Sequence, residues 1–112
     1  MKKDFYIFIE HILDSIEKIE EFTRNVSQSE FNRNIQLQDA IVRRIEIIGE
    51  AARNLPKNFT RKYPDIPWKE IIGTRDKIIH HYFGINLDII WDIIKRNIPD
   101  LKRKLKEVKH LK

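Results

Sequence analysis

The amino-acid sequence predicts an all-α protein, an antiparallel bundle of about four to five helices joined by short loops. Apolar residues recur three or four positions apart in every long segment, which is the spacing of one buried helix face. No segment alternates apolar and polar residues as a strand would. At 112 residues the chain has the length of one domain, residues 1–112, with a single modest core.

The N-terminal half contains two of the predicted long helices. The first covers residues 3–24, where isoleucine and phenylalanine form one stripe. Ser27 and Glu30 then have the spacing of a capping box, which predicts a short helical turn. The second long helix is expected over residues 35–55. Gly49 lies in its middle, where glycine costs roughly 1 kcal/mol relative to alanine, so we interpret Gly49 as a point of close helix packing.

Prolines and caps divide the C-terminal half. Pro67 is well placed as the first residue of a third long helix over residues 67–82, and Gly84 would end it. Asn86 can cap the next helix, and Pro99 should break or kink the chain before a final basic helix. The buried stripe of the helix after Asn86 is expected to be Leu87, Ile90, Trp91 and Ile94.

This half has more apolar helix surface than so short a chain easily covers. A helix that is apolar around most of its circumference is buried on more than one side. A two-fold homodimer is the commonest way to bury such surface, and a monomer with a large core is the alternative. The residues concerned are Ile71, Ile72, Ile78, Ile79, Tyr82, Ile85, Ile89, Ile90, Trp91, Ile93 and Ile94.

Composition excludes several classes of protein. No run approaches the 18 apolar residues of a membrane span, and acidic residues interrupt the apolar N-terminal segment, unlike a signal peptide. The absence of cysteine excludes disulfides, a thiol nucleophile and a thiolate metal site. We therefore expect a cytoplasmic protein with no membrane partner.

The positive charge is concentrated in two segments. The net charge is +5, with +4 in residues 53–82, +6 in residues 95–112 and −5 in the remainder. This distribution suits a polyanionic partner such as a nucleic acid, because each neutralised phosphate releases counterions. For the basic tail, a solvated helix face is the alternative.

The segment GTRDKIIHHYFG, residues 73–84, places four chemically capable residues within about two helical turns: Arg75, Asp76, His80 and Tyr82. Asp76 and His80 are four apart, so the carboxylate can hold one tautomer of the imidazole. Histidine transfers protons near neutral pH, and arginine donates two hydrogen bonds to a phosphate. These groups predict RNA cleavage by attack of the 2′-hydroxyl, with no metal or other cofactor.

The spacing of this segment also favours a dimer. Arg75 and His80 are five apart, about 140° around a helix, which is awkward for one rigid site. A second copy across a two-fold axis could bring both faces into one cleft. His11 and Asp14 are three apart but lack further ligands, so no metal site is predicted. We interpret His11 as a surface residue.

The chain resembles the HepT-type branch of the HEPN superfamily (higher eukaryote and prokaryote nucleotide-binding domains). The family motif is Arg, four intervening residues, His, one residue and Tyr, and Arg75, His80 and Tyr82 match it in place. Asp76 departs from the commoner Asn, and His81 adds a second imidazole. The segments that carry the resemblance are FIEHILDSIEKIEEF, RRIEIIGEAARNLP, YPDIPWKEIIGTRDKIIHHYFGINLDIIWDII and IPDLKRKL.

The resemblance implies a helical dimer, in which motifs from both subunits face one cleft, and a metal-independent endoribonuclease activity. It also implies a toxin whose antitoxin is a minimal nucleotidyltransferase, which attaches nucleotide to the tyrosine that Tyr82 matches. Lys69, Lys77 and His81 are candidate RNA contacts, although a solvated lysine is the alternative for the first two. For Asp76, the alternative to orienting the histidine is a helix-surface salt bridge with a nearby lysine.

Two other functions stay open from the sequence. The chain could be a non-catalytic nucleotide-binding or interaction module that works alongside a nucleotidyltransferase. Such a scaffold has no need of the Arg75–His80 pair, so substitution of that pair distinguishes the two. A basic helical DNA-binding protein is the weaker alternative, because no helix-turn-helix spacing is evident.

Overall fold

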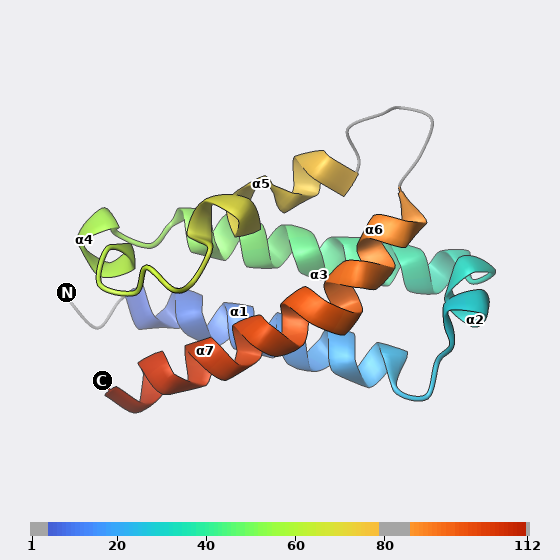
Figure 1. The fold of residues 1–112 in the computed structure, drawn as a ribbon, viewed down its shortest axis with the longest axis horizontal. Helices are drawn as coiled ribbons and strands as arrows, with labels where there is room; N and C mark the ends of the chain where they lie inside the picture. Colours follow the sequence, from blue (N-terminus) through green and yellow to red (C-terminus); the bar gives the residue numbers. More distant parts are fainter. Residues whose placement is uncertain (1–4, 79–85, 112) are drawn as a thin grey trace.

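The computed structural model of the chain describes residues 5–78 and 86–111, the last three by their backbone only. Long helical segments run back and forth along the long axis of the molecule, each roughly antiparallel to the one before it (Figure 1). They are α1 (Tyr6–Thr23), α3 (Ile35–Arg53), α5 (Trp68–Ile78) and the continuous run of α6 (Leu87–Asp92), η2 (Ile93–Asn97) and α7 (Ile98–Leu111). The single turns α2 (Gln28–Asn32) and α4 (Lys57–Thr60) lie between them. No strand forms in the described residues, and the predicted all-α bundle is confirmed.

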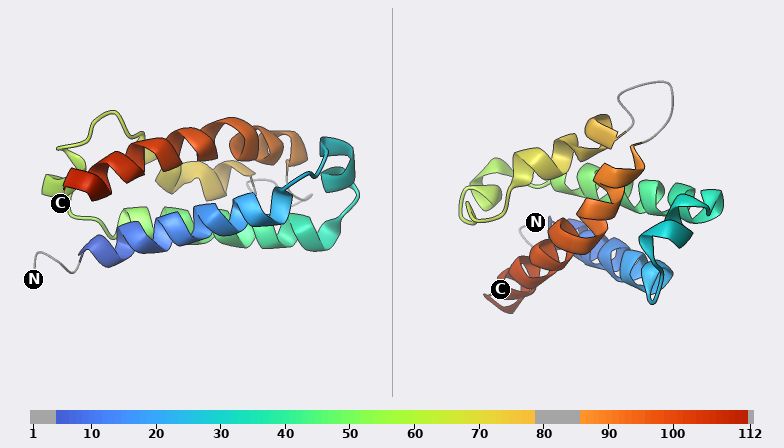
Figure 2. Two further views of the ribbon diagram at one scale, coloured as in Figure 1. Left: turned by 90° about the horizontal axis from the view of Figure 1, so that it is seen from below. Right: turned by 45° about the vertical axis from the view of Figure 1, so that its right-hand side comes forward.

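The core forms from the predicted apolar stripes. Helix α3 packs against both α1 and α5, and α7 lies across α1 (Figures 1 and 2). Burial of each isoleucine in this core is worth about 1.5–3 kcal/mol. The most deeply buried residues, at most 1% exposed, include Ile9, Ile12, Ile16, Ile19, Phe31, Ile41, Ile78, Ile90 and Leu105.

Side-chain caps fix where several helices begin. The Ser27 hydroxyl accepts a hydrogen bond from the Glu30 amide at 3.1 Å, and the Glu30 carboxylate accepts one from the Ser27 amide at 2.8 Å. Asn86 accepts from the Ile89 amide at 3.1 Å. These hydrogen bonds confirm both predicted caps. Each cap accepts from a backbone amide that has no partner within its helix.

Helix α5 begins one residue later than predicted. Its first residue is Trp68, and Pro67 occupies the cap position with its carbonyl accepting from the Ile71 amide at 3.0 Å. The Trp68 indole donates to the Tyr63 carbonyl at 3.1 Å, which anchors the start of the helix. The predicted end of this helix, including Gly84, lies outside the described residues.

A break or a kink was expected at Pro99, and the structure shows no break. The backbone stays helical from Leu87 to Leu111, and Pro99 occupies the second position of α7. A turn of π-helix, Ile93–Asn97, directly precedes α7. Inside a helical run, proline has no amide hydrogen to donate and its ring crowds the preceding turn; here that preceding turn is the wider π turn. The two last predicted helices are therefore one continuous run.

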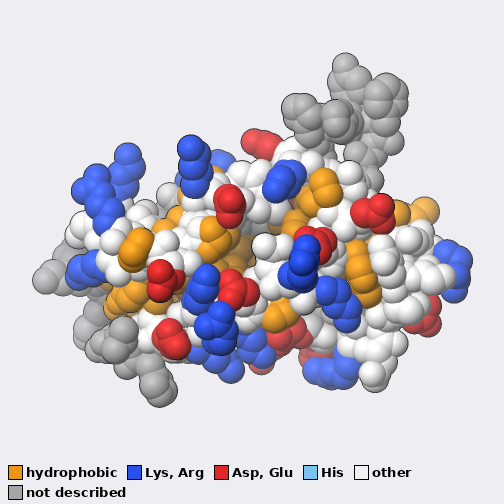
Figure 3. Space-filling view, in the orientation of Figure 1, with side chains coloured by type: hydrophobic (Ala, Val, Ile, Leu, Met, Phe, Trp, Pro, Cys, Tyr) orange, Lys and Arg blue, Asp and Glu red, His pale blue; other side chains and the backbone are white. Residues whose placement is uncertain are grey.

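The apolar excess is only partly absorbed by this core. Ile78, Ile90 and Ile94 are 1%, 0% and 6% exposed, but other residues of the set line an open groove of about 480 Å³ between α5 and the α6–α7 run (Figure 3). The half-buried isoleucines of this groove are Ile71, Ile89 and Ile93. Dimerisation remains a prediction. In the described part of the chain, no helix is both long and apolar enough to cross a membrane.

Candidate functional site

A close approach of two helices sets the geometry of the site. A Cβ atom on Gly49 would lie 3.4 Å from the carbonyl oxygen of Ile71 and 3.5 Å from that of Ile72. The backbone of α5 therefore reaches van der Waals distance at Gly49, and the predicted close packing is confirmed. Because α3 and α5 are antiparallel, the residue one turn before Gly49 meets the residue one turn after Ile72. Those residues are Glu46 and Arg75.

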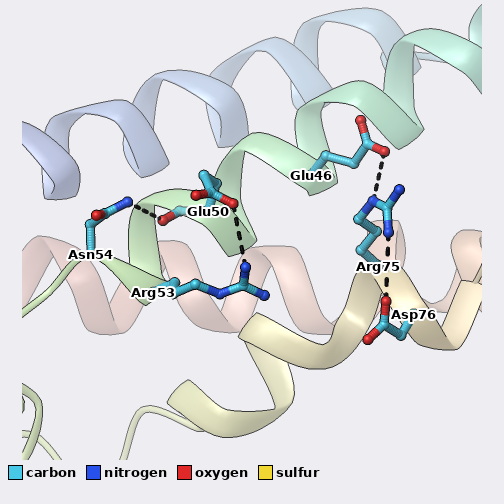
Figure 4. Close-up of polar contacts among 6 residues, drawn as sticks. All are labelled: Glu46, Glu50, Arg53, Asn54, Arg75 and Asp76. Atoms are coloured by element: carbon cyan, nitrogen blue, oxygen red, sulfur yellow. Dashed lines mark hydrogen bonds and ion pairs between the residues drawn. The ribbon is translucent and has the colours of Figure 1, made fainter.

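Arg75, the motif arginine, is held by a carboxylate from another helix. Its Nε donates to Oε2 of Glu46 at 3.0 Å, and its Nη1 lies 3.6 Å from Oδ1 of Asp76 (Figure 4). The second oxygen of Glu46 lies 3.8 Å from Nη1 of Arg43. The side chain of Arg75 is 53% exposed and that of Glu46 is 27% exposed. The solvent-facing guanidinium of Arg75 is thus held by the half-buried carboxylate of Glu46.

Arg75 borders a shallow groove of about 370 Å³ between α1, α3 and α5. The apolar lining residues, buried or half-buried, are Phe8, Ile47 and Ala51. The polar lining residues are His11, Arg43, Glu46, Glu50 and Asn54. The rings of Phe8 and His11 meet edge to face, with centroids 6.4 Å apart. The groove combines two cations and two carboxylates with an imidazole and an aromatic ring; the cations and rings are groups that contact phosphate and base.

The predicted site residues are only partly brought together. The Asp76 carboxylate, 81% exposed, pairs with Arg75 rather than with a lysine. His80, His81 and Tyr82 lie outside the described residues, so the pairing of Asp76 with His80 stays a prediction. Lys69 and Lys77, the two lysines predicted to contact RNA, are both exposed. Lys77 lines the larger groove, away from Arg75.

Sequence reasoning missed most of the groove. His11 is exposed, as interpreted, yet it lines the same groove as Arg75. Glu46 went unnoticed because it lies outside the motif. A signal was present, since the polar residues of α3 that line the groove recur every three or four positions. They are Arg43, Glu46, Glu50 and Asn54, at the end of the helix.

Comparison with known proteins settles the family. The family model described as "Ribonuclease HepT-like" matches residues 12–108. The chain belongs to the ribonuclease HepT-like family. The HepT-like fold of the HEPN superfamily, inferred from the resemblance, is thus confirmed. The matched region contains Arg75 and the α3 residues that line the groove beside it, but not Phe8 and His11 of α1.

Relatives of this HepT-like chain carry ribonuclease names. "Probable ribonuclease HepT" of Thermococcus cleftensis is 42% identical over 109 residues, 97% of this chain and 99% of the relative. A "Putative RNase" of Caldanaerobacter subterraneus subsp. tengcongensis is 48% identical over 101 residues, 90% of each chain. A "Gamma-glutamylcyclotransferase and putative RNase" of Methanocaldococcus jannaschii is 48% identical over 108 residues.

The coverage of these relatives differs. The HepT-like chain is covered to 96% by the Methanocaldococcus protein but spans only 49% of that protein's length. No solved structure matches the chain. The family and the names together support a ribonuclease of the HEPN type.

Proposed function

We propose that this chain is a metal-independent endoribonuclease that acts in the cytoplasm as the toxin of a toxin–antitoxin pair. The observation that carries the proposal is Arg75, an exposed cation at the edge of a groove and anchored from α3, in a chain of a ribonuclease family. Arginine is always charged and donates to phosphate oxygens in a fixed geometry.

The proposed reaction is an internal transfer within the RNA. His80 takes the proton of the 2′-hydroxyl, the 2′-oxygen forms a bond to phosphorus, and the bond from phosphorus to the 5′-oxygen breaks. The imidazolium of His80 then gives its proton to the leaving 5′-oxygen, so the products are a 2′,3′-cyclic phosphate and a 5′-hydroxyl. Arg75 stabilises the charge that builds on the phosphate oxygens. Asp76 orients His80 and stabilises the imidazolium.

RNA binding would draw on the positive charge around the motif. Lys69 and Lys77 are exposed on α5, and His81 adjoins the catalytic histidine in sequence. Each lysine that contacts phosphate contributes through counterion release, so binding should weaken with salt. A homodimer would place a second motif at the same cleft. The open groove between α5 and the α6–α7 run supports this proposal, because it leaves apolar surface partly uncovered.

The proposed partner is a minimal nucleotidyltransferase antitoxin that attaches nucleotide to Tyr82. Tyr82 is seven residues after Arg75, which is close to two turns of an ideal helix. Added phosphates there would occupy the arginine and repel RNA by charge. The support for this step is the family motif, in which Tyr82 takes the place of the modified tyrosine.

A non-catalytic nucleotide-binding module remains the second candidate. One observation favours it, since two carboxylates, Glu46 and Asp76, already neutralise Arg75. A structural ion pair between α3 and α5 would show the same geometry. Such a module would bind RNA or nucleotide without cutting it.

The deciding experiment is cleavage of end-labelled RNA in EDTA by the wild type, Arg75→Ala and His80→Ala, with the mass of Tyr82 checked beforehand. Arg53→Ala is the matched control, because Arg53 is similarly exposed and pairs with Glu50 on α3, outside the motif (Figure 4). We expect cyclic-phosphate ends from the wild type and the control only. Binding without cleavage by unmodified wild type would favour the non-catalytic module, and equal cleavage by both motif variants would remove the catalytic role.

A further inference from the structure

We infer that Glu46 is the positioning residue of Arg75, which it holds by the Nε side so that the Nη groups face a phosphate. The inference rests on the proposed ribonuclease function. Glu46 comes from α3, 29 residues before Arg75, and is no part of the motif.

The two carboxylates near Arg75 differ in how firmly they hold it. Nε of Arg75 donates to Glu46 at 3.0 Å, whereas Nη1 is 3.6 Å from Asp76, beyond hydrogen-bond distance. Glu46 is 27% exposed and Asp76 is 81% exposed, so water screens the Asp76 contact more strongly. A phosphate can therefore displace Asp76 from the Nη side while Glu46 keeps the Nε side.

Packing fixes Glu46 in turn. Its helical neighbours Ile45 and Ile48 are buried, 4% and 3% exposed, which sets the rotation of α3. The contact of α5 at Gly49 sets the spacing of the two helices. The second carboxylate oxygen of Glu46 faces Arg43 at 3.8 Å. That contact is longer and more exposed than the one to Arg75, so the packing of α3 against α5 is what keeps the Glu46 carboxylate beside Nε of Arg75.

This arrangement has two opposite consequences for catalysis. Orientation of the guanidinium favours the transition state, since hydrogen bonds to the phosphate need the Nη groups in place. Partial neutralisation of its charge weakens binding of the RNA before reaction. Removal of Glu46 should therefore lower kcat while KM stays unchanged or falls. A residue with a merely structural role would not separate kcat from KM in this way.

The test compares Glu46→Ala and Glu46→Gln with Asp39→Ala, an exposed carboxylate of the same helix outside the groove. Steady-state cleavage of labelled RNA gives kcat and KM, and thermal melting confirms that each variant is folded. We expect Glu46→Ala to lose about 10-fold or more in kcat, because orientation is lost. Glu46→Gln keeps an oxygen that accepts from Nε, so it should retain kcat within about 3-fold. Asp39→Ala should match the wild type.

A second readout does not depend on cleavage. The Nε–H signal of Arg75 in a ¹⁵N NMR spectrum, assigned by its loss in Arg75→Lys, should exchange slowly in the wild type and in Glu46→Gln but rapidly in Glu46→Ala. Wild type that does not cleave would overturn the proposed function, and the NMR signal would still decide the ion pair. Cleaving wild type with an equally active Glu46→Ala, or a rise in KM alone, would overturn the positioning role.

Discussion

The carbonyl oxygen of Ile71 lies 3.4 Å from the place that a Cβ on Gly49 would occupy, which is ordinary van der Waals contact. An alanine therefore just fits at Gly49, and it would gain up to about 1 kcal/mol in helix propensity. A leucine does not fit unless α5 moves, and overpacking of this kind costs about 1–3 kcal/mol. We expect the free energy of unfolding in urea to stay level or rise in Gly49→Ala and to fall in Gly49→Leu.

Gly73 provides the control for this prediction. It lies within α5, and a Cβ there would meet nothing within 4 Å. Gly73→Ala should raise the free energy of unfolding by about 0.5–1 kcal/mol through backbone entropy alone. A clear loss of stability in Gly49→Ala beside a gain in Gly73→Ala would mean that α3 and α5 tolerate no added atom at their crossing.

Local signals in the sequence predicted most of the fold. The apolar stripes and the caps at Ser27 and Asn86 depend only on spacing and on bonds between residues three apart, so they were confirmed. The continuous helix through Pro99 could not be foreseen in the same way. A π turn lies directly before α7, and the residue spacing of a sequence does not indicate this rare i→i+5 arrangement.

The site was predictable only as far as the motif extends. Arg75 and Asp76 were identified within the motif segment, but the ion pair between them was not predicted, because the alternative considered for Asp76 was a salt bridge with a nearby lysine. Glu46 and His11 come from other helices, and their place beside Arg75 depends on the crossing of α3 with α5 and on the packing of α1. A single sequence gives the residues of each face but not which faces meet.

Ser15 is a buried polar residue whose replacement should stabilise the protein. Its side chain is 1% exposed, and its hydroxyl has no hydrogen-bond partner in the described part of the chain. Burial of an unpaired hydroxyl costs about 1–3 kcal/mol, which Ser15→Ala removes at little loss of volume. We expect Ser15→Ala to raise the free energy of unfolding by about 1 kcal/mol in urea titrations.

Gln38 gives the opposite expectation with a similar degree of burial. Its Nε2 donates to the carbonyl of Phe31 at 2.9 Å, and the residue is 7% exposed. Gln38→Leu should lower the free energy of unfolding by about 1 kcal/mol in the same titrations, because the Phe31 carbonyl loses the bond from Gln38 and keeps the one from the Asn34 amide.

For Ser15, a loss of stability in Ser15→Ala would show that the hydroxyl has a hydrogen-bond partner in solution.

Two carboxylates with lowered pKa, those of Glu30 and Asp100, predict a loss of stability in acid. Hydrogen bonds from the Ser27 amide and then its hydroxyl lower the pKa of Glu30 from its ordinary value of 4.5. The side chain of Lys104, and then that of Arg103, lowers the pKa of Asp100 from its ordinary value of 3.8. A lowered folded pKa adds stability above the ordinary pKa, and that stability is lost as the pH falls through the lower value.

Glu30→Gln tests this dependence, because glutamine can keep the capping box without the charge. Urea unfolding at pH 7 and pH 3 should show a smaller loss of stability on acidification for Glu30→Gln than for the wild type. A variant whose loss equals that of the wild type would show that the capping bond does not depend on the charge of Glu30.

Arg75→Lys separates the charge of the arginine from its geometry. Lysine keeps the positive charge, but its three donors share one nitrogen and cannot span Glu46 and a phosphate as Nε and the two Nη groups of arginine do. We expect cleavage to fall by about 10²-fold, as when a donor to a transition-state oxyanion is removed. The slope of log Kd for RNA against log salt should stay unchanged, since it counts the phosphates neutralised. Full cleavage by Arg75→Lys would mean that only the charge of Arg75 matters for catalysis. A shallower slope of log Kd against log salt would mean that Arg75 acts mainly in RNA binding.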